Sequence, residues 1–78
     1  MELKLKISET LKTLKPIKEE EHLILKHLLP LKTQTEEDLM LHYGRTKEEL
    51  DVEIRELTKV VEAYDLAIAL LEREFYSL

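Results

Sequence analysis

The C-terminal part of the chain carries an apolar side chain at alternating intervals of four and three residues. The pattern runs from residue 50 to residue 78 without an exception. Such spacing places every member on one side of a helix and is typical of a coiled-coil heptad. We name these positions the heptad seam: Leu50, Ile54, Leu57, Val61, Tyr64, Ile68, Leu71, Phe75 and Leu78.

The helix that carries the heptad seam has a clear predicted start and no predicted break. Thr46 and Glu49 have the spacing of a capping box, and no proline or glycine follows them. We therefore predict a helix over 46–77, about 46 Å long at about 1.5 Å per residue. Branched residues at a and leucine at d favour a parallel two-stranded coiled coil, and an intramolecular hairpin has the same pattern.

A second apolar strip follows the heptad seam through the middle of this helix. It consists of Val60, Ala63, Ala67 and Leu70, and it makes the apolar face wider than the two positions that a simple dimer buries. The middle of the helix must therefore contact more than one neighbour. We expect the first half of the chain to fold back on it and two chains to join into a bundle of four or more helices.

The N-terminal residues 1–14 fit two patterns. Their first seven residues alternate between apolar and polar, which is the period of a strand. Four apolar residues, however, would also share one face of a helix: Leu3, Ile7, Leu11 and Leu14. We favour the helix.

Two prolines bound the next predicted helix. Pro16 suits the first turn of a helix and disfavours helical geometry just before it, so we expect a break or kink there. Pro30 disfavours helical geometry at the residue before it. The prolines therefore predict a helix over 16–29.

A short helix is predicted over 35–43, capped by Thr35 at its start and ended by Gly44, the only glycine of the chain. The sequence as a whole predicts one all-α domain over residues 1–78. Its architecture is a helical bundle in which a long C-terminal, coiled-coil-like amphipathic helix packs on shorter N-terminal helices.

Composition makes association plausible for this chain. Its 78 residues are 44% hydrophobic and 37% charged, and a chain this short is only marginally stable as an isolated monomer. No apolar run is long enough for a bilayer, and the charged N-terminus lacks the features of a secretory signal. These features, with the absence of cysteine, lead us to expect a cytoplasmic protein.

Charge is unevenly distributed along the chain. The net charge is −5, which divides into +2 over residues 1–34 and −7 over residues 35–78. An acidic surface repels the phosphate backbone of nucleic acids. The distribution therefore favours a basic or polar protein as the partner.

Residues 36–58 resemble a helix-turn-helix, with a short helix, a glycine turn and a capped second helix. In a DNA-binding protein of this kind the contacts would come from Arg45, Lys47 and Arg55. Acidic side chains outnumber these cations on the second helix, so a helical corner without DNA binding is the alternative that we favour.

No catalytic site is predicted. Ser8 and Ser77 lie near the ends of the chain, and no glycine-rich loop is present to bind phosphate. Glu19 and His22 form one Glu-x-x-His pair, but the second pair needed for a two-metal site is absent from the sequence. We therefore expect no enzyme activity, cofactor or metal.

These patterns lead to a hypothesis of a small interaction or regulatory protein. We expect it to form a homo-oligomer, with a dimer favoured, and to bind an unidentified protein but no membrane. The expected oligomer interface consists of Leu50, Ile54, Leu57, Val61, Tyr64, Ile68, Leu71 and Phe75. The alternatives are a DNA-binding transcriptional regulator dimerised by the long helix, and an acidic inhibitor that mimics DNA.

Overall fold

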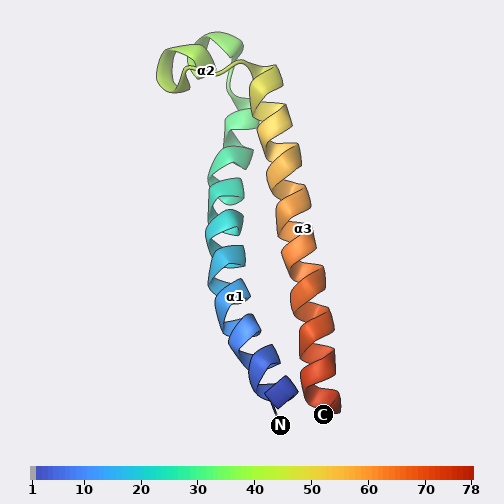
Figure 1. Cartoon of the computed structure of the whole chain (residues 1–78). Coiled ribbons are helices and arrows are strands. Elements are labelled where there is room, and N and C mark those ends of the chain that lie inside the picture. Colours follow the sequence, from blue (N-terminus) through green and yellow to red (C-terminus); the bar gives the residue numbers. More distant parts are fainter. Residues whose placement is uncertain (1) are drawn as a thin grey trace.

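The computed structural model describes residues 2–78 as a helical hairpin (Figure 1). Its elements are α1 (Glu2–Leu28), the short 3₁₀ helix η1 (Leu29–Thr33), α2 (Glu36–Tyr43) and α3 (Lys47–Ser77). The fold is 92% helical, and the described residues contain no strand. The predicted all-α class, with a long C-terminal helix packed on the N-terminal half, is confirmed.

The two long helices determine the shape of the molecule. α1 and α3 lie side by side in opposite directions, with both termini at one end and α2 at the other (Figure 1). The hairpin measures 57 × 15 × 14 Å, and its radius of gyration is 17.2 Å, whereas a compact chain of this length has a radius of gyration of about 12 Å. The molecule is therefore a rod two helices across.

The first helix is longer than the sequence indicated. It begins at Glu2 and runs through Pro16 to Leu28, so the predicted break at residue 16 and the separate helix over 16–29 are wrong. Proline lacks the N–H that would bond to the carbonyl of Lys12. Side chains of α1 on both sides of Pro16 pack against α3, and we infer that this packing holds the helix continuous.

The short helix α2 has a defined cap at each end. The Thr35 hydroxyl accepts the backbone N–H of Asp38 at 3.1 Å, as a serine or threonine N-cap does. Gly44 has a φ of 66°, a left-handed conformation that glycine adopts without steric cost. Its N–H donates to the Met40 carbonyl at 3.1 Å, and the next N–H, of Arg45, reaches the Leu39 carbonyl at 3.5 Å.

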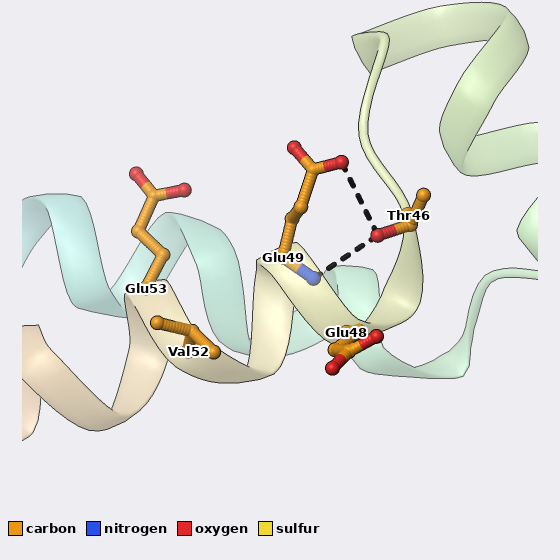
Figure 2. A pocket seen from close by; sticks show the side chains of 5 residues that line it. All are labelled: Thr46, Glu48, Glu49, Val52 and Glu53. Carbon is orange, nitrogen blue, oxygen red and sulfur yellow. Dashed lines mark hydrogen bonds between the residues drawn. The ribbon is translucent and has the colours of Figure 1, made fainter.

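The start of α3 is capped by a threonine and a glutamate. The Thr46 hydroxyl accepts the backbone N–H of Glu49 at 3.1 Å and donates to the Glu49 carboxylate at 3.3 Å (Figure 2). The carboxylate therefore bonds to the hydroxyl and not to the backbone N–H expected in a capping box. Because the cap follows the Gly44 turn directly, α3 starts in a fixed direction beside α1.

The core consists of two separate clusters. The cluster near α2 joins all three α-helices and contains Leu25, Leu28, Leu39, Leu50, Ile54 and Val61. The cluster near the termini joins only α1 and α3, through Ile7, Leu11 and Ile68. Between the clusters α1 presents two half-buried polar residues, Lys18 and Glu21.

We expect Pro16→Ala to stabilise the hairpin by about 2–3 kcal/mol, because alanine restores the hydrogen bond to the Lys12 carbonyl inside the helix. Pro16 is exposed, so the change leaves the core unaltered. Urea unfolding followed by circular dichroism, at fixed protein concentration, measures the difference. The exposed Glu20→Ala is the control, with an expected change below about 0.5 kcal/mol; a destabilised Pro16→Ala would contradict a helix continuous at this position.

Candidate interaction surface

Most of the heptad seam faces α1 of the same chain. Leu50, Ile54, Val61 and Ile68 are buried, and each belongs to a core cluster that includes residues of α1. Their neighbours along the seam are only half-buried, and the last member is exposed: Leu57, Tyr64, Leu71, Phe75 and Leu78.

Helix α1 carries a matching seam with the same intervals of four and three residues. Its apolar members are Ile7, Leu11, Leu14, Leu25 and Leu28. Two positions in the middle hold charged residues, Lys18 and Glu21. These intervals continue across Pro16, although a proline at this position also suits the start of a helix.

The predicted oligomer interface stays a prediction, since the structure is that of a single chain. The four buried seam residues can contact a second chain only if the hairpin opens. The half-buried seam residues and the second apolar strip, in contrast, are accessible in the closed hairpin. The strip includes Val60, 38% exposed, and Leu70, 53% exposed.

One side of the hairpin is bridged by charged pairs. The Lys15 ammonium lies 3.9 Å from the Glu72 carboxylate, and the Lys18 ammonium lies 2.8 Å from that of Asp65. The hydrogen bond with Asp65 and its negative charge raise the pKa of Lys18 above its usual 10.5. The two ion pairs make this side of the hairpin polar.

The middle of the opposite side of the hairpin is apolar. A groove of about 370 Å³ runs between the two long helices and is lined by Leu14 of α1 with Val60, Ala63, Tyr64 and Ala67 of α3. Three of the lining residues belong to the second strip found in the sequence. The structure thus brings that strip together with a leucine from a distant part of the chain.

The three cations considered for DNA contact are not all available to a phosphate backbone. Arg45 pairs with Glu53, so its charge is compensated within the chain. Lys47 and Arg55 are exposed and lie eight residues, about 12 Å, apart along α3. The backbone N–H of Lys47 donates to the Glu36 carboxylate at 2.8 Å, so its amide is already occupied.

The surface beside these cations is acidic. A shallow hollow at the start of α3 is lined by Thr46, Glu48, Glu49, Val52 and Glu53 (Figure 2). Glu49 and Glu53 extend from the same side of the helix, as expected for residues four apart. Their negative field opposes the approach of a phosphate backbone.

Within residues 2–78, no three histidine or acidic side chains lie close enough together to hold a metal ion. The helices of that part of the chain also include none with the length and apolar character needed to cross a bilayer. Glu19 and His22, the pair considered as half of a metal site, are both exposed.

Comparison with known proteins identifies no relative. No protein-family model, curated protein or solved structure matches the chain. We therefore infer function from the chemistry and packing of the chain's own residues.

The internal use of the seam predicts different effects of the same substitution at its two ends. Leu50 is 1% exposed and Leu78 is 48% exposed. Leu50→Ala should therefore destabilise the protein by about 3 kcal/mol through lost burial and a cavity, whereas Leu78→Ala should cost less than about 1 kcal/mol. Denaturant unfolding of both variants measures the two values. Equal losses would mean that the end of the seam is covered as completely as its start.

Proposed function

We propose that this protein is a small non-enzymatic interaction protein, of the regulator or adaptor kind, which oligomerises through α3 and binds a second protein. The observation that carries the proposal is the exposed apolar surface of the hairpin. Within residues 2–78, fourteen large hydrophobic side chains are exposed, compared with nine residues in the buried core. One of them, Val60, lines the apolar groove between the long helices, and a contiguous apolar surface on a small protein marks an interaction site.

The shape of the hairpin explains why so much apolar surface is exposed. A rod two helices across has one contact line between its helices, so each helix covers only a narrow stripe of the other. Apolar positions outside that stripe need a third or fourth helix to bury them. Association with another chain supplies those helices and adds stability to a chain of marginal size.

The charge on the C-terminal half supports a protein as the further partner. Residues 35–78 contain twelve acidic side chains, of which Glu53, Glu56, Asp65 and Glu72 form ion pairs within the described residues. The surplus negative charge attracts a basic surface and repels nucleic acid. The compensated charge of Arg45 also supports a protein partner over DNA.

Self-association predicts a solution mass of at least two chains, and a melting temperature that rises with protein concentration, because an oligomer is stabilised by mass action. Light scattering coupled to gel filtration, over a wide range of concentration, measures the mass. Charged substitutions in the seam are poor probes, since Ile68→Glu would place a charge in the hairpin's own core. The wild-type chain gives the cleaner result.

A monomer at every concentration, with a melting temperature independent of concentration, would contradict the oligomeric part of the proposal. The interaction surface would then be available only to a different protein. A mixed result, with mass and melting temperature both rising over the series, would give the dissociation constant directly.

A further inference from the structure

The two sides of the hairpin differ in what they offer a partner. Lys15 and Lys18 bridge the helices on one side through ion pairs, and Leu14 lines the apolar groove on the other. Ile17 lies one helical turn beyond Leu14, on the same side of α1. Leu70 extends the α3 side of the groove in the same way, seven residues beyond Ala63. We name the side of the hairpin that carries the groove, Ile17 and Leu70 the groove side.

We propose that the groove side is occupied by the groove side of a second copy of this chain, with the two hairpins antiparallel and α3 lying against α3. This inference rests on the proposed function and adds to it the surface, the partner and the orientation. The resulting assembly is a four-helix bundle with two-fold symmetry, the commonest symmetry of soluble oligomers.

The order of residues in the second strip indicates that the two copies are antiparallel. Along α3 it reads Val60, Ala63, Ala67, Leu70, with intervals of three, four and three. Both the sizes and the intervals are symmetric about the midpoint. An antiparallel two-fold axis at that midpoint places Val60 of each copy against Leu70 of the other, and Ala63 against Ala67. The small pair at the centre allows close approach, and the large pairs fill the space on either side.

Helix α1 is consistent with the same axis. The midpoint of the strip lies at residue 65, and Asp65 is paired with Lys18 at 2.8 Å, so the axis passes α1 at the level of Lys18. Ile17, on the groove side, then lies next to Ile17 of the second copy. The same apolar residue meets itself close to the axis, as in an isologous interface.

The two groove sides can overlap along most of the hairpin. The strip's midpoint, residue 65, lies close to residue 62, the middle of α3, so two antiparallel hairpins overlap along most of their length. The apolar part of this overlap is the second strip itself, which spans about 15 Å of α3 at about 1.5 Å per residue. At each end of the strip the axis brings Glu56 of one copy to the level of Glu74 of the other, so the contact is acidic beyond its apolar centre.

The interface is tested by the same substitution on two sides of α3. Ala63 and Ala69 are both exposed in the single chain, and they point about 120° apart around the helix. Ala63→Glu should convert the dimer to a monomer, because it places a charge at the centre of the apolar contact. Ala69→Glu should leave the mass unchanged. Circular dichroism should show equal helix content in both variants.

A dimeric Ala63→Glu would overturn the groove-side interface while the proposed self-association stands. A monomeric wild-type chain would overturn both. Loss of helix in Ala63→Glu but not in Ala69→Glu would mean that the hairpin needs this surface covered. The Ala63→Glu chain is then refolded with excess wild-type chain and the mass is measured. A mixed dimer supports the interface, and the absence of a mixed dimer contradicts it.

The orientation has its own test, which keeps the surface close to native. The chain contains no cysteine, so Ala63→Cys and Ala67→Cys introduce single thiols. Oxidation of an equal mixture should give mainly the crosslinked pair of the two different variants, because residues 63 and 67 face each other across the axis. Replacing either variant in the mixture with an Ala69→Cys chain should give far less crosslinked product. Equal crosslinking in all mixtures would overturn the antiparallel arrangement.

Discussion

The packing of α1 against α3, residue by residue at the same intervals of four and three, is the contact on which every other feature depends. It covers Ile54, Val61 and Ile68 without any second chain. It also holds α1 helical through Pro16, where a backbone hydrogen bond is lost. The register of this contact decides which side of the hairpin receives the ion pairs and which side receives the groove.

The turn at the far end makes that register possible. Gly44 reverses the chain in a left-handed conformation, and the Thr46 cap begins α3 immediately afterwards. Leu39 of α2 is fully buried and belongs to the larger core cluster, which also contains residues of both long helices. The cluster at this end is therefore the better packed of the two, and the polar residues Lys18 and Glu21 separate it from the cluster near the termini.

A rod of two helices cannot by itself bury all the apolar residues of this sequence. The heptad seam has a partner within the chain, whereas the second strip does not. The same geometry that buries the first set exposes the second, because the two strips lie on different sides of α3. The proposed self-association and the proposed groove-side interface follow from this division, with the acidic surface left free for a different partner.

The sequence alone determined the heptad seam, the second strip, the Thr35 and Thr46 caps and the Gly44 turn, because periodicity and capping are local properties of the backbone. It could not decide whether the seam pairs within the chain or between chains, since both give the same intervals. It also suggested a break at Pro16, because the local cost of proline is visible in the sequence while the long-range packing that offsets it is not. Only the tertiary structure, which places Leu14 beside Val60, Ala63 and Tyr64, defined the groove.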